Sequence, residues 1–363
     1  METTRVRICL AVFLATIGVV CVIFQSVATT HDADEALCTL FEASMNACYE
    51  EDFEQALQLA LEVRQQYPDD PAGTFGLLTT YQTIQRNYRV KLYEPQIDSL
   101  LDLSIHLAKN ALKKNKRDGR NYFYLGTALG FRSMFNAEQG KWMDAFKDGS
   151  QVLRNFNKAI AYSPDFYDAY YGLGLYKYWL GAKGAIRYLP FARKSRNQGI
   201  TRIKITIEKG RFLRVNAMYG LLAIYYHEQE FEQAFQLSER LFKTYPRNPT
   251  LNYRRGRILQ ELGRWSEALQ SFENLNKILT TTKYRCTSYQ IDCLYQMAVC
   301  NYKLENYLET QRFCQQAILL EQQVDFSGET DGPIEKFSDI QSELHKLSDQ
   351  VKTIVVSGVS DSE

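Results

Sequence analysis

The chain has 363 residues, of which 45% are hydrophobic, a fraction that excludes wholesale disorder. Its 43 basic and 42 acidic side chains leave a net charge of +1, which excludes a protein dominated by nucleic-acid electrostatics. Only 8 prolines and 20 glycines stand beside 24 tyrosines and 20 phenylalanines, which favours long helices with aromatic packing over a turn-rich β fold.

The N-terminal residues have the pattern of an export signal. Two arginines precede an uncharged run over residues 8–24, and small residues follow at Ser26 and Ala28. The run is slightly shorter than the ~20 apolar residues of a membrane span. Two interpretations remain open: residues 1–30 are a cleaved signal peptide, or they are a signal anchor. In both, we expect the rest of the chain to be exported, to a periplasmic or other extracytoplasmic location.

A period of about 34 residues then recurs along the chain. In a frame that starts at Pro249, small Gly256 falls at position 8, Ala268 at position 20 and Phe272 at position 24. One period earlier, and again near Phe53, residues of similar size fall at matching positions. Proline follows the second helix of three units, in the segments YPDDP, YPRNP and YSPD.

These residues resemble the tetratricopeptide repeat (TPR) family, and the resemblance covers most of residues 35–322. It implies paired helices, in which a small residue at position 8 lets the first helix approach the alanine at position 20 of the second. Proline ends the second helix because it has no N–H and restricts the residue before it. We therefore predict an all-α fold, a right-handed TPR-like α-solenoid of about seven hairpins over residues 31–322. The arrangement also resembles exported or membrane-anchored bacterial TPR proteins, and this resemblance implies no particular activity.

The middle of the array departs from the strict period. Over residues 75–111 and 122–164 the helix positions return late, which predicts elongated hairpins. The fourth unit is interrupted by glycines and a proline over residues 181–190, and we expect its second helix over 195–208.

Residues 323–363 form a separate C-terminal part. Residues 326–333 are rich in turn-forming residues and predict a linker. An apolar stripe that includes Ile340 and Leu344 then predicts an amphipathic helix over 334–351. This helix would cap the last repeat, and the final residues would form a frayed tail.

The sequence has no motif of catalysis or cofactor binding. The four histidines are scattered without a metal-site spacing, and His227 is expected in the groove or the core. The GxSxG, Walker and dinucleotide-binding patterns do not occur. We therefore predict a protein that is not an enzyme and has no cofactor and no metal.

Six cysteines follow the N-terminal segment, and they form no CxxC pair, so zinc and thioredoxin-type sites are not supported. Two interpretations remain open. The cysteines are small apolar residues of the core, or some form disulfides, such as Cys300 with Cys314 across a hairpin.

The TPR resemblance implies a concave surface lined by the first helix of each pair, at positions 2, 5, 9, 12 and 13. Tyrosine recurs at positions 5 and 12, which predicts a tyrosine-lined groove for a protein segment. The open alternative is that several of these rings pack between neighbouring helices. The predicted groove residues are Tyr171, Tyr178, Tyr219, Tyr226, Tyr253, Tyr295 and Tyr302.

Basic residues gather on the fourth unit, where the repeat is interrupted. Such a charge run is commonly a solvated face, and here it is also a candidate contact for an acidic partner or for anionic lipid headgroups. The predicted basic patch is Arg187, Arg193, Lys194, Arg196, Arg202 and Lys204.

These features predict a non-catalytic scaffold of the cell envelope that binds protein partners in the groove, without nucleic acid or a small-molecule cofactor. The alternative is a carbohydrate-binding or polysaccharide-guiding envelope module, in which the same rings stack on sugar faces. Membrane association through residues 8–24 is compatible with both.

Overall fold

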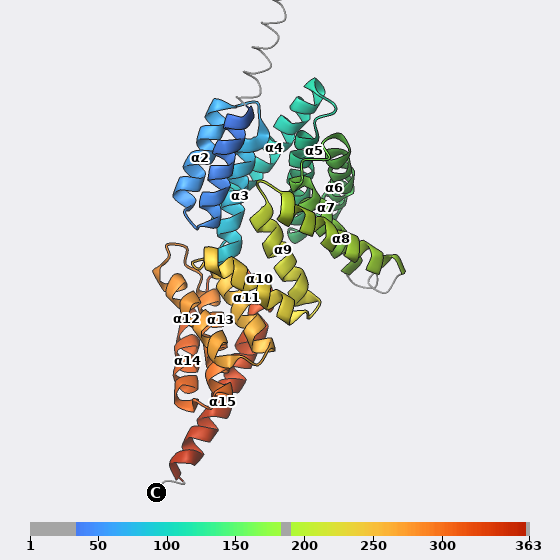
Figure 1. Ribbon diagram of the computed structural model, residues 1–363. Coiled ribbons are helices and arrows are strands. Elements are labelled where there is room, and N and C mark those ends of the chain that lie inside the picture. Colours follow the sequence, from blue (N-terminus) through green and yellow to red (C-terminus); the bar gives the residue numbers. More distant parts are fainter. Residues whose placement is uncertain (1–33, 183–189, 361–363) are drawn as a thin grey trace, which may run out of the picture.

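A computed structural model describes residues 34–182 and 190–360, so the predicted signal segment over 1–30 and Arg187 lie outside the described residues. In these two ranges the chain is all-α, apart from one isolated bridge between Val90 and Glu329. Every helix there is too short or too polar to span a membrane. The helices pair into seven consecutive hairpins and a final helix, as the repeat predicts (Figure 1). After a first helix over residues 34–49, they are α2 (Phe53–Gln66), α3 (Pro71–Tyr88), α4 (Glu94–Lys114), α5 (Gly119–Glu138), α6 (Trp142–Tyr162), α7 (Asp168–Ala182), α8 (Pro190–Lys209), α9 (Arg214–His227), α10 (Phe231–Thr244), α11 (Pro249–Glu261), α12 (Trp265–Thr281), α13 (Thr287–Lys303), α14 (Tyr307–Leu320) and α15 (Phe337–Ser360).

The boundaries between hairpins fall where the sequence places proline. α2 ends at Gln66, and α3 begins at Pro71 after Asp70, whose carboxylate caps the helix. The same arrangement opens α11, where Asn248 is the cap and Pro249 follows at the first helical position. Proline suits this position because the first N–H groups of a helix have no partner within it.

Small residues set the distance between paired helices. A Cβ at Gly256 would lie 2.5 Å from the ring of Phe272, which is completely buried. A Cβ at Gly76 would likewise lie 3.0 Å from the Cβ of Ala60 on the preceding helix. The small residues of the repeat therefore act through close packing, since even one added methyl group would force a neighbour to move.

The middle hairpins are elongated, as the late return of the repeat predicts. α3 to α6 and α8 have 18 to 21 residues, whereas α9, α10 and α14 have 14. α8 begins at Pro190 rather than near residue 195, because proline is tolerated in the first turn of a helix. The predicted cap is α15, which begins three residues later than expected and buries Ile340 and Leu344.

The first hairpin also contacts repeats that are distant in sequence. The Tyr49 hydroxyl donates a hydrogen bond to the carbonyl of Phe212, 163 residues away (2.8 Å). The rings of Phe41 and Phe212 meet edge to face at 5.0 Å, and Arg211 forms an ion pair with Glu35 (2.9 Å). In an open solenoid each repeat contacts only its neighbours. These closing contacts instead hold the first hairpin beside the loop that leads into α9 (Figure 1).

A second set of closing contacts joins the first two hairpins to the start of α11. The carboxylate of Glu51 accepts hydrogen bonds from the side chains of Asn87 (2.7 Å) and Asn248 (2.6 Å) and from the Tyr88 hydroxyl (3.1 Å). The Thr250 hydroxyl donates to Asn87 (3.0 Å). Burial raises the pKa of Glu51 to about 8, although these hydrogen bonds oppose the rise. The end of α3 therefore lies against α11.

The six cysteines of the described residues are all free thiols, so the disulfide suggested for Cys300 and Cys314 does not form. Five are buried and Cys38 is half-buried, which favours the interpretation as small apolar core residues. Burial raises the pKa of Cys286 to about 12 and that of Cys48 to about 11, so these thiols stay protonated at neutral pH.

Candidate binding groove

Residues 324–336, which we call the C-terminal strap, lie along the first helices of the last repeats. The strap pairs with the residues that follow α3. The Lys91 N–H donates to the Gly328 carbonyl (2.8 Å), and the Thr330 N–H donates to the Arg89 carbonyl (3.0 Å). The sequence predicted a plain linker over most of this stretch. The structure shows this segment packed on α11, on α13 and on the residues that follow α3 instead.

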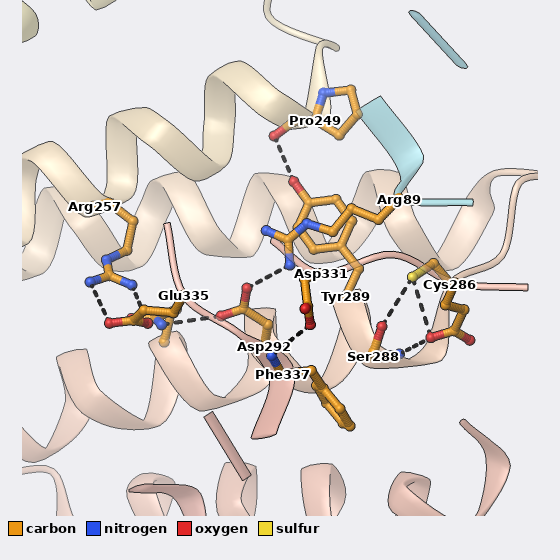
Figure 2. A network of polar contacts seen from close by, with 12 residues as sticks. Arg89, Pro249, Arg257, Cys286, Ser288, Tyr289, Asp292, Asp331, Glu335 and Phe337 are labelled. Atoms are coloured by element: carbon orange, nitrogen blue, oxygen red, sulfur yellow. Dashed lines mark hydrogen bonds and ion pairs between the residues drawn. The ribbon is translucent and has the colours of Figure 1, made fainter. Parts of the chain in front are cut away.

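Two carboxylates attach the strap to the helices beneath it. Glu329 accepts hydrogen bonds from the N–H groups of Thr287 (2.9 Å) and Ser288 (2.8 Å) at the start of α13, where a helix favours negative charge. Glu335 accepts two hydrogen bonds from the guanidinium of Arg257 on α11 (2.6 and 3.1 Å). Such bidentate pairing fixes direction as well as position. Figure 2 shows both ends of this network.

Arg89, at the end of α3, is buried between the strap and the repeats. Its guanidinium forms an ion pair with Asp292 on α13 (2.7 Å), and both side chains are almost completely buried. It lies 3.6 Å from the centroid of the Tyr289 ring and 4.6 Å from that of Tyr253 (Figure 2). A Cβ at Gly332 of the strap would lie 2.9 Å from the same guanidinium. One side chain therefore joins α3, two repeats and the strap.

Beside the strap, the groove contains a pocket of about 430 Å³. Its walls are largely aromatic, and the strap forms one side. The ring of His227 is held by the Tyr178 hydroxyl, 2.7 Å from Nδ1, and it meets Trp179 edge to face at 5.2 Å. The lining residues are Trp179, Ala223, Tyr226, His227, Gln229, Phe231, Arg254, Glu261, Pro333 and Ile334.

Arg254 gives this pocket a positive charge. Burial, and secondarily the nearby charge of Arg86, lower the pKa of Arg254. Among the described residues neither guanidinium has a hydrogen-bond or ion-pair partner. Glu261 lines the same pocket, but its carboxylate accepts from the Tyr226 hydroxyl (3.5 Å) rather than from Arg254. An arginine in this setting offers a planar set of donors to a carboxylate.

Four of the seven predicted groove tyrosines lie within the packed array. Tyr178 and Tyr253 have no exposed surface, and Arg89 covers the Tyr253 ring. Burial raises the pKa of Tyr171 to about 12, and the Tyr219 hydroxyl is buried without a hydrogen-bond partner in the described residues. The open alternative, in which several of these rings pack between neighbouring helices, therefore fits Tyr178 and Tyr253, and Arg89 at the end of α3 covers the Tyr253 ring.

The other three predicted tyrosines are partly exposed, as are Tyr171 and Tyr219. Tyr226 lines the pocket, and Tyr302 meets Tyr307 edge to face at 5.8 Å. The pKa of Tyr295 rises to about 12, mainly through burial and next through the charge of Glu335 on the strap. The binding role of these three residues stays a prediction.

The predicted basic patch separates into two groups. Arg193, Lys194 and Arg202 line a surface pocket of about 480 Å³ on α8. Arg196 instead pairs with Glu228 (3.6 Å), and the Lys204 ammonium lies 6.0 Å from the centroid of a tyrosine ring on α9. Among the described residues of the patch, Arg196 is therefore the one whose charge is matched by an ion pair.

Sequence reasoning missed the strap and the arginines that surround the groove. Arg257 occupies position 9 of the frame that starts at Pro249. Position 9 is one of the concave positions that the TPR resemblance implies, so Arg257 could have been predicted as a groove residue. Arg89 could not have been predicted in this way, because its partners lie more than 160 residues away in sequence.

Within residues 34–182 and 190–360, no group of His, Cys, Asp and Glu is arranged to hold a metal ion.

No protein-family model and no curated protein sequence matches the chain. A similar solved structure is YrrB, described as a TPR protein with an unusual peptide-binding site, at 16% identity and a TM-score of 0.41 over 59% of this chain and 92% of that chain. The consecutive helical hairpins and the close packing at Gly76 and Gly256 make the fold TPR-like. The Cut9–Hcn1 hetero-tetramer of the APC/C is similar over 74% of this chain and 43% of that chain, at 12% identity and a TM-score of 0.48. PilW, described as a widely conserved type IV pilus biogenesis factor, is similar over 65% of this chain and 90% of that chain, at 13% identity and a TM-score of 0.43.

Proposed function

We propose that this TPR-like protein is a non-catalytic scaffold that binds an extended segment of a partner protein in the concave groove. The observation that carries the proposal is the strap. The strap, a segment of the same chain, is held through backbone hydrogen bonds, a bidentate arginine and a helix N-terminus. These contacts are those by which proteins recognise an extended peptide.

The partner segment would bind beside the strap, in the pocket formed by Tyr226, Trp179 and Arg254. The aromatic walls suit an apolar or aromatic side chain, which would bury its surface there. Arg254 has no charge partner in the described residues, so a ligand carboxylate would relieve an unfavourable buried charge. An extended segment with an acidic residue next to an apolar one is the ligand that this pocket favours.

We further propose that the protein works outside the cytoplasm, in the cell envelope. The support is the N-terminal pattern of two arginines, an uncharged run over 8–24 and small residues at Ser26 and Ala28. Cell fractionation of the tagged full chain tests this proposal, and recovery in the cytoplasm alone would contradict it.

A peptide-display selection on the full chain tests the groove. We expect enriched peptides that combine Asp or Glu with an apolar residue, and their affinity is measured by fluorescence anisotropy. Arg254→Gln should weaken binding by about tenfold or more, because a buried charge-assisted contact is lost. Arg240→Gln, at an exposed arginine on α10, is the matched control and should leave the affinity unchanged.

Selected peptides that bind Arg254→Gln as tightly as the wild type would contradict the groove assignment. Failure to select any peptide, together with retention on an envelope polysaccharide, would favour the carbohydrate-binding alternative. The aromatic walls of the pocket alone do not distinguish the two ligands, whereas the unpaired Arg254 favours a carboxylate-bearing segment.

A further inference from the structure

The turn between α5 and α6 presents an unusual group of large apolar side chains to solvent. Met134, Trp142, Met143 and Phe146 are exposed by 61%, 69%, 88% and 79%. We call residues 134–147 the α5–α6 tip. Scattered single exposures of this kind are ordinary, but four within so short a stretch form a patch that marks an interaction site.

The α5–α6 tip is held in a defined conformation, so the exposure of its apolar side chains does not result from a poorly packed turn. Gly140 has a φ of 75°, which lets the chain reverse direction between the two helices. The Ser133 hydroxyl donates to the carbonyl of Ala145 (2.7 Å), and Arg132 pairs with the buried Asp148 (2.7 Å) across the hairpin. The helices thus project the apolar side chains outward from a fixed base.

Exposed cations surround this apolar group. Lys141 lies at the turn, and Lys147 and Arg154 continue along the outward side of α6. In the described residues none of the three has a hydrogen-bond or ion-pair partner for its charged group. The sequence of the tip also contains two acids, Glu138 and Asp144. The patch therefore combines apolar side chains with three cations that outnumber the acids by one.

The neighbouring hairpin extends this surface. α5 and α7 are both first helices of their pairs and contact one another. On the second of these hairpins Phe191 is 58% exposed at the start of α8, and it is followed by the exposed Arg193 and Lys194, which have no ion-pair partner in the described residues. The same combination of an aromatic ring with cations thus appears on two consecutive hairpins.

From this arrangement we infer that the edge formed by the α5–α6 tip and the start of α8 docks on the surface of an anionic lipid bilayer. Trp142, Met143 and Phe146 enter the interface between headgroups and acyl chains, where aromatic and apolar side chains are stabilised. The lysines and arginines around them contact the lipid phosphates. A bilayer surface covers the protruding apolar side chains and pairs with the cations at the same time. The inference is independent of the groove and of its ligand.

Trp142 itself reports on this docking in the full-length protein. We measure its fluorescence, and its quenching by brominated lipid, with vesicles of phosphatidylcholine alone or mixed with phosphatidylglycerol. The other two tryptophans, Trp179 and Trp265, are less exposed. The fluorescence of the Trp142→Phe variant shows how much of the total emission comes from these two. A local readout is needed because the apolar run over residues 8–24 can bring the chain to vesicles by itself.

We expect a blue shift and quenching with the anionic vesicles only, lost at high salt. Met143→Ser with Phe146→Ser should weaken the response by about tenfold or more, and so should Lys141→Glu with Lys147→Glu. The matched controls alter residues of equal exposure elsewhere. They are Leu308→Ser with Leu319→Ser on α14, and Lys116→Glu with Lys243→Glu.

Vesicle binding without any change in Trp142 fluorescence would overturn the inference, because the chain would then be held by another segment. A Trp142 response to polyglutamate but not to anionic vesicles would overturn it in favour of an acidic protein partner. Equal effects of the tip variants and the matched controls would also contradict it. Circular dichroism should show unchanged helix content in every variant, since all the substituted residues are exposed.

Discussion

The first hairpin and the α5–α6 hairpin follow the same repeat pattern, yet they have opposite relations to the rest of the molecule. The first hairpin packs against the starts of α9 and α11 through Tyr49 and Glu51, which reach partners 163 and 197 residues away. The α5–α6 hairpin contacts helices near it in sequence and leaves its turn in solvent. The same repeat pattern therefore forms one hairpin that closes the array and another that exposes its turn to solvent. The residues on the outer surface of each hairpin decide which of the two occurs.

Breaking the buried ion pair at the strap should have the largest effect. Asp292→Ala leaves the Arg89 guanidinium buried without its partner, and we expect a loss of about 3–5 kcal/mol in the free energy of unfolding, measured in urea by circular dichroism. Arg89→Met with Asp292→Leu should recover much of this loss, because apolar side chains need no charge partner. As a control, Glu343→Ala removes an exposed ion pair on α15 and should cost under about 1 kcal/mol. If Asp292→Ala and Glu343→Ala lowered the free energy of unfolding by similar amounts, the central position of Arg89 would be contradicted.

The closing contact at Glu51 should depend on pH. Its folded pKa of about 8 lies above its ordinary value of 4.5, so the folded chain holds a proton that the unfolded chain releases. Stability should therefore fall as the pH rises from about 4.5 to about 8, with a slope of at most about 1.4 kcal/mol per pH unit. Glu51→Gln keeps the side-chain shape without the titration, so its unfolding free energy should vary less across this range. Parallel pH profiles of variant and wild type would contradict the assignment.

Removal of the Tyr49 hydroxyl should have a smaller effect. Tyr49→Phe leaves the buried carbonyl of Phe212 without this donor, and we expect a loss of about 1–2 kcal/mol in urea denaturation. Tyr170→Phe is the matched control in the middle of the array, since its hydroxyl bonds to the Pro164 carbonyl at an exposed position (3.2 Å). If both variants lost equal stability, the first hairpin would not be held more firmly than the middle.

Changes at the α5–α6 tip should have the smallest effect on stability. Met143→Ser with Phe146→Ser removes side chains that are already in solvent, so we expect a change within about 0.5 kcal/mol. A loss of more than about 2 kcal/mol would mean that these side chains are buried in the folded protein. The comparison with Tyr49→Phe then separates residues that close the array from residues that present a surface.

The local features of the fold could be predicted from the sequence. Proline and the preceding cap residue determine where α3 and α11 begin, since both act on their own and adjacent residues. The spacing of Gly256 and Phe272 predicts a close hairpin for the same reason. The apolar stripe of Ile340 and Leu344 predicts a helix whose buried face needs a neighbour. These signals lie within a few turns of the residues that they position.

The candidate site could be predicted only in part, because its composition depends on contacts that cross the array. Tyr226 at position 12 and Tyr253 at position 5 are both predicted groove residues, yet one lines a pocket and the other is buried under Arg89. The TPR resemblance assigns both to the concave surface. Which of them a ligand can reach depends on where α3 and the strap come to lie.

The sequence by itself determined the helices, their pairing and the cap, because each follows from the size and hydrogen bonding of residues close together in the chain. Only the tertiary structure decided that the array closes on itself and that the strap enters its own groove. These arrangements rest on matching charges and hydrogen-bond donors, such as Arg89 with Asp292 and Arg257 with Glu335, from segments far apart in sequence. A repeat period contains no information on such pairs, since it describes how neighbours stack and not where distant surfaces meet.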